Sequence, residues 1–326
     1  MSRRHPLVIG HRGAPGYRPE HSRSSYALAL ASGVDAVEPD VVVSRDGVLV
    51  VRHENEISGT TDVADRPEFA DRRTTKTVDG IELTGWFTED FTADELATLR
   101  CRERLPGLRP GSAAFDDVEP VLRVRDVLDL VWAASIDQQR WIGVVLEIKH
   151  ATHFAQQGWD VAQLVAAELR EAGWATGEQS LVIESFEPTV LGELQSLGVP
   201  GSYVHLIEAV GRPYDLVVAQ GRAAPSYRWL TQPTGLDTLA GRFDGISVNK
   251  RLILGDSSLV TDAHERGLQV YVWTCRPENA FLARRFRLPG GPAAFGDHQR
   301  EWGELRDAGV DGVFIDHPDL GVAFFR

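Results

Sequence analysis

The sequence predicts an α/β fold, a closed TIM (β/α)₈ barrel with an insertion after the hairpin of its second strand. Eight short runs rich in Val, Ile and Leu recur along the chain, and stretches that can hold a helix separate many of them. Near-continuous apolar runs are typical of parallel strands buried on both faces. Strands that alternate with helices favour a barrel, with a doubly wound open sheet as the alternative. The runs span 7–10, 36–43, 143–148, 181–186, 202–207, 244–248, 268–274 and 310–315.

The helices expected between these strands have recognisable ends. Several of them end in an Ala-Gly or Leu-Gly pair just before the next strand, at Gly173, Gly198, Gly267 and Gly309. The expected helices span 22–32, 121–135, 159–172, 188–197, 256–266 and 299–308. We interpret residues 1–326 as a single domain.

Two regions interrupt the rhythm. Residues 54–120 are polar and too long for a barrel loop without its own structure, so we predict an insertion there. Thr92 followed by Glu95 is a capping-box pattern and predicts a helix near 92–100. The stretch 209–242 is the other irregular region.

Composition excludes several classes of function. The 326 residues are 43% hydrophobic and 25% charged, which is typical of a globular protein, and the net charge is −13. That acidity argues against a nucleic acid or an anionic membrane as the main partner, because both require a basic surface. Two cysteines, Cys101 and Cys275, predict neither a disulfide framework nor a zinc cluster. No run has the length of a membrane helix or the form of a signal peptide, so we expect a cytoplasmic protein, with a trimmed secreted form as the alternative. The oligomeric state stays open.

Carboxylates at strand ends predict a metal site. Glu38 and Asp40 are two residues apart in one strand and therefore face the same side of the sheet. Their repulsion is most simply relieved by a divalent cation, and Glu147 on the next strand supplies a third oxygen ligand. Oxygen ligands alone favour Mg²⁺ or Ca²⁺ over zinc.

Two histidines are expected at the same end of the barrel. His11 follows the first strand, and Asp46-Gly47 between two Val-rich runs predicts a hairpin that leads to His53. If Val43 pairs with Val48, His53 lies opposite Glu38 on the same face, whereas a slip of one residue would turn it away.

Together these residues predict a phosphodiester site. A metal ion, Arg12 and Lys149 would neutralise the phosphate. One histidine would take a proton from the nucleophile while the other gives one to the leaving alkoxide. Trp273, near the end of the seventh strand, is either a core aromatic or part of the substrate site.

These residues also carry a family resemblance. The chain resembles the glycerophosphodiester phosphodiesterase family in the order and spacing of its motifs. They are His11-Arg12-Gly13, Pro19-Glu20-His21, Glu38-Pro39-Asp40, Asp46-Gly47, His53 and Glu147-Ile148-Lys149, with shorter echoes at Ser185-Phe186, Trp273-Thr274 and Asp316-His317-Pro318-Asp319. Ser22, Glu54 and Ile315 depart from the usual Thr, Asp and Thr.

The resemblance implies a TIM barrel that hydrolyses glycerophosphodiesters, with a metal ion, to sn-glycerol 3-phosphate and an alcohol, within lipid and glycerol metabolism. It implies His11 and His53 as the acid/base pair and Arg12 and Lys149 as phosphate contacts. It implies Glu38, Asp40 and Glu147 as ligands of one Ca²⁺ or Mg²⁺. Two alternatives remain: a phospholipase-D-like lyase that forms a cyclic phosphate, and a non-catalytic phosphodiester-binding barrel.

Overall fold

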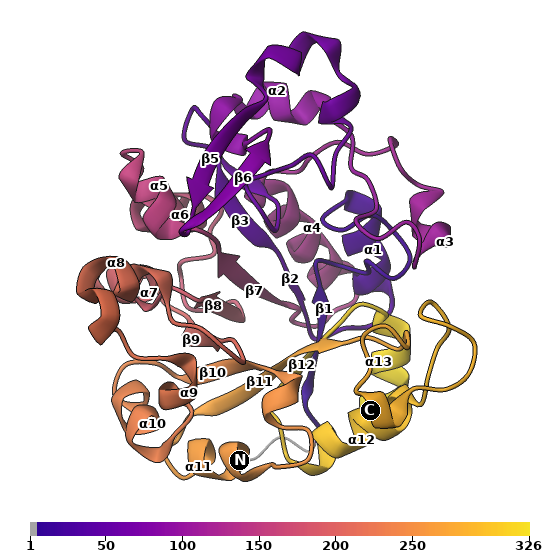
Figure 1. Ribbon diagram of the computed structural model, residues 1–326, viewed down its shortest axis with the longest axis vertical. Helices are drawn as coiled ribbons and strands as arrows, with labels where there is room; N and C mark the ends of the chain where they lie inside the picture. Colours follow the sequence, from indigo (N-terminus) through magenta and orange to yellow (C-terminus); the bar gives the residue numbers. More distant parts are fainter. Residues whose placement is uncertain (1–4) are drawn as a thin grey trace.

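The structure, a computed structural model that describes residues 5–326, contains a closed barrel with eight parallel strand positions (Figure 1). Pairing of the first strand with the last, and of the second position with the third, closes the barrel. This confirms the predicted fold class. The barrel strands are β1 (Leu7–His11), β2 (Ala36–Glu38) with β3 (Asp40–Val43), β7 (Gly143–Ile148), β8 (Leu181–Ser185), β9 (Ser202–Ile207), β10 (Gly245–Asn249), β11 (Gln269–Cys275) and β12 (Gly312–Ile315).

The second position differs from the single strand expected over 36–43. It divides at Pro39 into β2, which pairs with β1, and β3, which pairs with the end of β7 and with the antiparallel β4 (Leu49–Val51). Proline lacks the N–H that a ladder needs, so the division falls at that residue. Every residue of β2, β3 and β4 is buried, as their apolar sequences predict.

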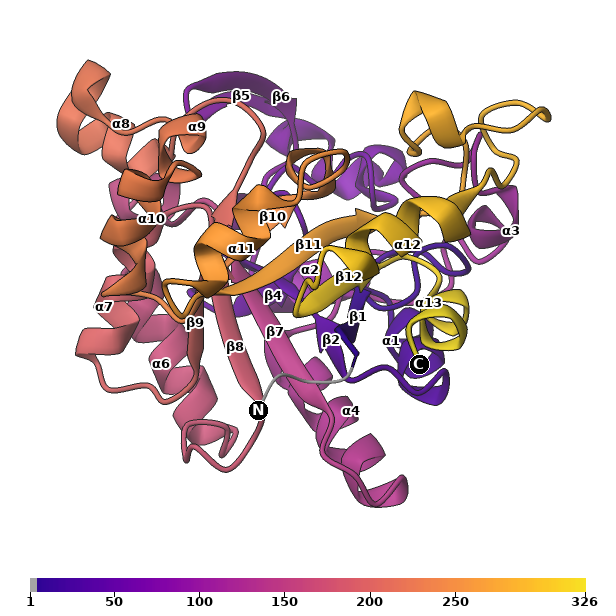
Figure 2. The same ribbon diagram turned by 90° about the horizontal axis from the view of Figure 1, so that it is seen from below.

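Helices surround the barrel on its outside (Figure 2). The expected helices are present within a few residues of their predicted ends, as α1 (Arg23–Ala31), α4 (Val124–Asp137), α6 (Val161–Glu171), α7 (Pro188–Ser196), α11 (Ser258–His264) and α12 (His298–Asp307). Helices that the pattern did not predict are α5 (Ala151–Gln156), α8 (Tyr214–Gln220), α9 (Tyr227–Leu230), α10 (Pro233–Ala240) and α13 (Pro318–Phe325). Short 3₁₀ turns complete the barrel loops at η4 (Gly221–Ala223), η5 (Lys250–Leu252) and η6 (Arg284–Phe286). No described helix combines the length and apolar character that crossing a bilayer requires.

The β3–β4 hairpin corrects the predicted register. Val43 pairs with Leu49 instead of Val48, so the expected pairing of His53 with Glu38 is wrong. The Ser44 N–H donates to the Val48 carbonyl at 3.0 Å, which leaves a three-residue loop whose last residue, Gly47, has a φ of +79°. Loops of this kind require a left-handed residue at that position, and glycine adopts it without strain.

The insertion is a folded layer of its own. It comprises η1 (Val63–Asp65), η2 (Pro67–Arg72), β5 (Thr74–Val78), β6 (Ile81–Gly85), η3 (Thr88–Asp90), α2 (Ala93–Thr98) and α3 (Pro110–Ala113). The capping box that starts α2 is present: the Thr92 hydroxyl accepts from the Glu95 N–H at 3.2 Å, and the Glu95 carboxylate accepts from the Thr92 N–H at 2.8 Å. The Thr88 hydroxyl donates to the Val43 carbonyl, which ties the insertion to the barrel.

Candidate active site

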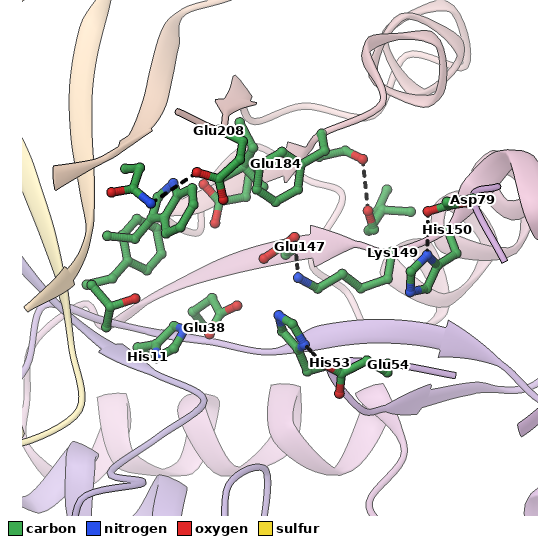
Figure 3. A pocket seen from close by; sticks show the side chains of 18 of the residues that line it. His11, Glu38, His53, Glu54, Asp79, Glu147, Lys149, His150, Glu184 and Glu208 are labelled. Carbon is green, nitrogen blue, oxygen red and sulfur yellow. Dashed lines mark hydrogen bonds and ion pairs between the residues drawn. The ribbon is translucent and has the colours of Figure 1, made fainter. Parts of the chain in front are cut away.

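A cavity of about 890 Å³ lies at the carboxyl ends of the barrel strands, and residues of the β5–β6 hairpin contribute to its lining. Figure 3 shows side chains that line it. Active sites of barrel enzymes occupy this end. Seven of the eight predicted site residues line the cavity: His11, Arg12, Glu38, His53, Glu147, Lys149 and Trp273. Asp40, the eighth, is not among the lining residues.

The alternation of the strands explains which side chains reach the cavity. A layer of apolar side chains fills the barrel interior, and it includes Ile9, Ala36, Val145, Val182, Tyr271 and Phe314. Side chains two residues apart point to the same face of a strand. The residues two positions further on are His11, Glu38, Glu147, Glu184, Trp273 and Asp316, and they stand directly above the apolar layer.

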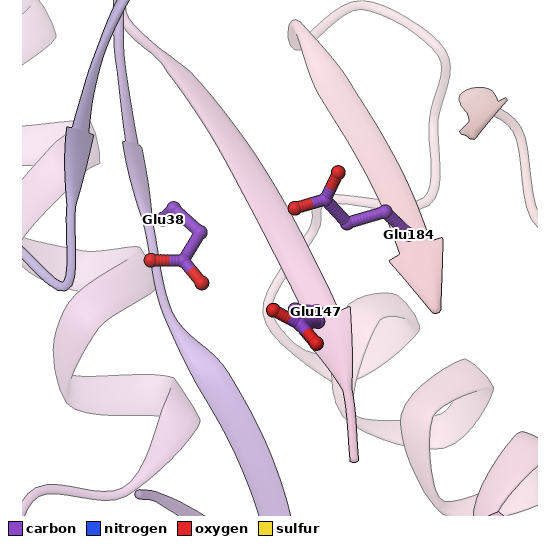
Figure 4. Close-up of side chains that lie close together, drawn as sticks. All are labelled: Glu38, Glu147 and Glu184. Atoms are coloured by element: carbon purple, nitrogen blue, oxygen red, sulfur yellow. The ribbon is translucent and has the colours of Figure 1, made fainter. Parts of the chain in front are cut away.

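Three of these residues form a carboxylate cluster (Figure 4). Glu38, Glu147 and Glu184 each bring one carboxylate oxygen to within 4.8 Å of the others. All three are buried, and one oxygen of Glu38 and one of Glu184 have no hydrogen-bond partner within residues 5–326. Burial, reinforced by the neighbouring carboxylates, raises the pKa of Glu147 to about 8 and that of the other two well above the usual range.

Asp40 occupies a different environment from the one predicted. The Nε2 of His21 lies 2.9 Å and the Nε of Arg12 lies 3.3 Å from one oxygen of Asp40, and the Lys149 ammonium lies 3.1 Å from the other. Glu184 instead of Asp40 completes the cluster with Glu38 and Glu147, and the role of Asp40 as a ligand stays a prediction. Burial would raise the pKa of Asp40, but Lys149 and the other cationic neighbours hold it well below its usual range.

The two predicted phosphate-binding cations lie beside these carboxylates. The ammonium of Lys149, the residue directly after β7, is 2.5 Å from a Glu147 oxygen, so the two side chains point the same way as expected. Arg12 has a φ of +55° and donates its backbone N–H to Glu38 at 2.7 Å, while its guanidinium donates to Glu20 at 3.0 Å. Each cation is already ion-paired to carboxylates that anchor it.

His11 is oriented by a buried carboxylate. Its Nδ1 lies 2.6 Å from an oxygen of Asp316, which directly follows the last barrel strand, β12. Arg109 and Arg276 each donate to the other oxygen of Asp316 at 2.6 Å. Burial opposes ionisation of Asp316, but the two arginines hold its pKa well below the usual range. An ionised carboxylate can only accept, so Nδ1 carries the proton and Nε2 has a free lone pair.

His53 has a parallel arrangement. Its Nδ1 lies 2.5 Å from Glu54, and Arg104 donates to both oxygens of Glu54 at 2.9 and 2.6 Å. The same guanidinium donates to both oxygens of Glu20, which in turn holds Arg12. His53 lines the cavity from beyond the end of β4, although the strand register that led to its prediction is wrong.

Both histidines favour the neutral form. Burial and the nearby Arg12 guanidinium lower the pKa of His11 to about 4, against the opposite effect of Asp316. Burial, Arg12 and Lys149 lower the pKa of His53 to about 3. Each neutral ring can accept a proton, and a bound anion would raise both pKa values.

Trp273 belongs to the wall of the cavity. Its indole N–H donates to the Ser247 carbonyl at 3.2 Å, and its ring meets Phe186 edge to face at 5.8 Å between centroids. These contacts fix the ring while one surface lines the cavity.

Sequence reasoning missed several members of the site. Glu184 could have been found from the period of two that follows Val182 in an apolar strand, as Glu147 was found from its own strand. Glu54 and Asp316 were noted only as motif residues. Arg104 and Arg109 come from the irregular part of the insertion, where no pattern in the sequence indicates their partners.

Comparisons with known proteins identify the family of the chain. Residues 11–320 match the model of the "Glycerophosphoryl diester phosphodiesterase family". A glycerophosphodiester phosphodiesterase of Arabidopsis thaliana is 30% identical over 95% of this chain and 83% of its own length. A glycerophosphodiester phosphodiesterase of Treponema pallidum is 26% identical over 98% of this chain and 91% of its own length.

Solved structures share the fold. An Oleispira antarctica phosphodiesterase, solved in complex with the product sn-glycerol-3-phosphate, superimposes with a TM-score of 0.62 at 18% identity, over 98% of this chain and 96% of that one. A glycerophosphodiester phosphodiesterase from Agrobacterium tumefaciens gives a TM-score of 0.57 at 19% identity, over 98% of this chain and 99% of that one.

Proposed function

Because this chain belongs to the glycerophosphoryl diester phosphodiesterase family and is a glycerophosphodiester phosphodiesterase, we propose that it hydrolyses its substrates to sn-glycerol 3-phosphate and an alcohol with a divalent cation and two histidines. The observation that carries this proposal is the pair of histidine–carboxylate contacts that face one cavity beside three buried glutamates. The product bound in the Oleispira antarctica relative supports the same bond cleavage.

The cluster of Glu38, Glu147 and Glu184 fits a divalent cation. Three buried carboxylates within 4.8 Å, two of them with an unpartnered oxygen, are costly unless a cation neutralises them. Asp40 lies on β3, directly opposite Glu147 on the neighbouring strand β7. It would join the three glutamates as a ligand of the cation if the Lys149 ammonium moved from Asp40 to the phosphate. Oxygen ligands suit Ca²⁺ and Mg²⁺ alike. The cation would offset the negative charge of the phosphate as the pentavalent transition state forms.

The histidines would move the two protons of the reaction. One ring accepts the proton of the nucleophile as its oxygen forms a bond to phosphorus. The other ring, protonated on Nε2 when the anionic substrate is bound, gives that proton to the alcohol oxygen as the bond between this oxygen and phosphorus breaks. Asp316 and Glu54 hold each ring by Nδ1, so Nε2 is the nitrogen that exchanges protons with the substrate. Arg12 and Lys149 would hold the phosphate oxygens.

The test is dependence of product release on a cation. The protein is treated with a chelator, and release of sn-glycerol 3-phosphate from glycerophosphocholine is followed as Ca²⁺ or Mg²⁺ is returned. We expect loss of activity on chelation and recovery with one or both ions. Full activity after exhaustive chelation would contradict the metal-dependent mechanism.

A further inference from the structure

The cavity has two chemically different sides. Around the barrel, β10, β11 and β12 adjoin β1, whereas β7, β8 and β9 form the opposite arc. Among the described lining residues, the loops after β10 and β11 carry Lys250, Arg251 and Arg276 and no carboxylate. The loops after β7, β8 and β9, with the β5–β6 hairpin above them, carry three carboxylates, Asp79, Glu187 and Glu208. We call this second side the acidic wall.

Aromatic rings accompany the carboxylates of the acidic wall. Phe186, Tyr214 and Tyr227 line it, and Trp273 adjoins it. Phe186 lies between Trp273 and Tyr227, with ring centroids 5.8 and 6.2 Å away and nearly perpendicular planes. The Lys149 ammonium already lies 5.9 Å from the centroid of the Phe186 ring, so a cation can approach this group of rings.

One carboxylate of the acidic wall is held ready for a ligand. Glu187 is 4% exposed, and Thr152 donates its N–H and its hydroxyl to one oxygen, Oε2. The other oxygen, Oε1, has no hydrogen-bond partner among the described residues, although the side chain lines the cavity. Burial, together with the carboxylates of Asp79 and Asp215, raises the pKa of Glu187 to about 7. The same region raises the pKa of Tyr227, through burial and through four carboxylates that include Glu187 and Glu208.

The cations on this side are committed elsewhere. Lys149 is held between Glu147 and Asp40. His150 bonds through Nδ1 to Asp79 at 2.6 Å, and the exposed Arg212 donates to the Ala224 carbonyl. Figure 3 shows Glu208 near Glu184 and the Asp79–His150 pair beyond Lys149, so the wall continues from the catalytic residues.

We propose that the acidic wall is the head-group subsite and that it selects glycerophosphodiesters whose alcohol carries an ammonium or trimethylammonium group. This inference rests on the proposed function, because it assigns one ester of the phosphodiester to this side of the cavity. A cation there contacts the faces of Phe186 and Tyr227 and pairs with Glu187 and Glu208. The sn-glycerol 3-phosphate half then lies toward β10 and β11, where Arg251 is exposed and where Lys250 and Arg276 are paired with Glu301 and Asp316.

The experiment compares diesters that share sn-glycerol 3-phosphate and differ only in the alcohol. Choline and ethanolamine esters present a cation, and glycerol and inositol esters do not, while all four release the same product. At pH 8 and low salt we expect kcat/KM to be about tenfold or more higher for the two cationic esters, with the difference shrinking as salt is added. Equal values for all four esters would overturn the inference and leave the proposed function intact, whereas no turnover of any ester would contradict the proposed function itself.

Two variants locate the selectivity. Glu187→Gln and Glu208→Gln remove one charge each, and we expect each to lower kcat/KM about fivefold to tenfold for choline and ethanolamine esters and less than twofold for the neutral esters. Glu178→Gln, which removes the same charge from an exposed loop, is the matched control and should leave kcat/KM unchanged for both the cationic and the neutral esters. If Glu187→Gln unfolds, Glu208→Gln, on a partly exposed side chain, carries the test. An equal loss for cationic and neutral esters would show that the wall is structural and would refute the inference.

Discussion

At the scale of single residues, the site consists of charged groups that are buried together with their partners. His11 and His53 each keep one nitrogen bonded to a carboxylate, and each carboxylate is bonded to an arginine. Such contacts fix the tautomer and the direction of each ring before substrate binds. The proposed chemistry depends on that prior orientation.

The first prediction concerns the histidine pair. His11→Ala and His53→Ala should each lower kcat about 10²–10⁴-fold, because each ring carries one proton transfer. The double variant should lose less than the product of the two, since the residues act as a unit. Steady-state kinetics on glycerophosphocholine measures this, and cation affinity should persist in both single variants. Full activity in His53→Ala alone would remove His53 from the mechanism.

The second prediction separates the carboxylates. Glu184→Gln should weaken cation binding about tenfold or more, because it removes a member of the carboxylate cluster. Asp40→Asn should weaken binding less, since Asp40 is already neutralised by Lys149 and Arg12. Calorimetric titration of chelator-treated protein with Ca²⁺ and Mg²⁺ ranks the two variants. The reverse ranking would favour the ligand set that the sequence predicts, with Asp40 in place of Glu184.

The third prediction is a pH dependence of stability. The pKa of His11 falls from about 6.5 in the unfolded chain to about 4 in the folded protein, so the unfolded state binds the proton first as pH decreases. The shift therefore contributes fully to the free energy of unfolding above pH 6.5, and this contribution is lost as the pH falls toward 4. Between pH 7.5 and 4.5 it should amount to about 2–3 kcal/mol. Urea unfolding with chelator present should show a correspondingly shallower pH dependence for His11→Asn, and identical slopes would contradict the pKa shift.

At the scale of elements, the hairpin and the insertion decide how the site is completed. The sequence predicts a hairpin at Asp46-Gly47, but the length of its loop depends on the Ser44 contacts with Asp46 and Val48, which a pattern of apolar residues does not specify. His53 still enters the cavity because β4 ends at Val51, before the alternation of a strand could turn the side chain away. Strand register therefore does not determine where a side chain points when its residue lies beyond the end of the strand.

The insertion supplies one arginine to each of the two carboxylates that hold the histidines. Arg104 donates to both oxygens of Glu54, and Arg109 donates to Asp316 and Glu278. The segment between α2 and α4 thus fixes the orientation of His53 and His11, which lie far from it in sequence.

The fourth prediction tests this positioning. Arg104→Lys and Arg109→Lys keep the charge but lose the planar fork, so each should lower kcat about tenfold with little change in KM. The acid limb of the pH–rate profile should also shift, because the histidine carboxylates lose a fixed partner. Arg102→Lys, in the same segment but paired with Asp65 and Asp117 on the surface, is the control. Unchanged kcat and pH profile in both variants would assign the two arginines to stability alone.

At the scale of the whole molecule, the alternation of side chains along each barrel strand places the site residues at one end of the barrel. Apolar residues at one level of the interior are followed, two residues later, by the histidine, carboxylates and tryptophan that face the cavity. The sequence predicts the eight strands and most of the helices around the barrel, because these depend on local patterns. It also predicts eight site residues, of which seven line the cavity. The helices within 214–240 could not be predicted, because their segments are short and lack a sustained apolar period. The partner arginines and the acidic wall could not be predicted either, because they depend on contacts between segments far apart in sequence.

The measurement that tests the central claim most directly is a ³¹P NMR time course of glycerophosphocholine turnover in ¹⁸O-enriched water. The account predicts that sn-glycerol 3-phosphate is the phosphorus-containing product, that it carries the ¹⁸O-shifted resonance of one solvent oxygen, and that chelator abolishes the signal. A cyclic phosphate as the final product would indicate attack by the substrate's own hydroxyl. Phosphocholine as the product, or no turnover with either cation, would contradict the assignment of the bond that this site cleaves.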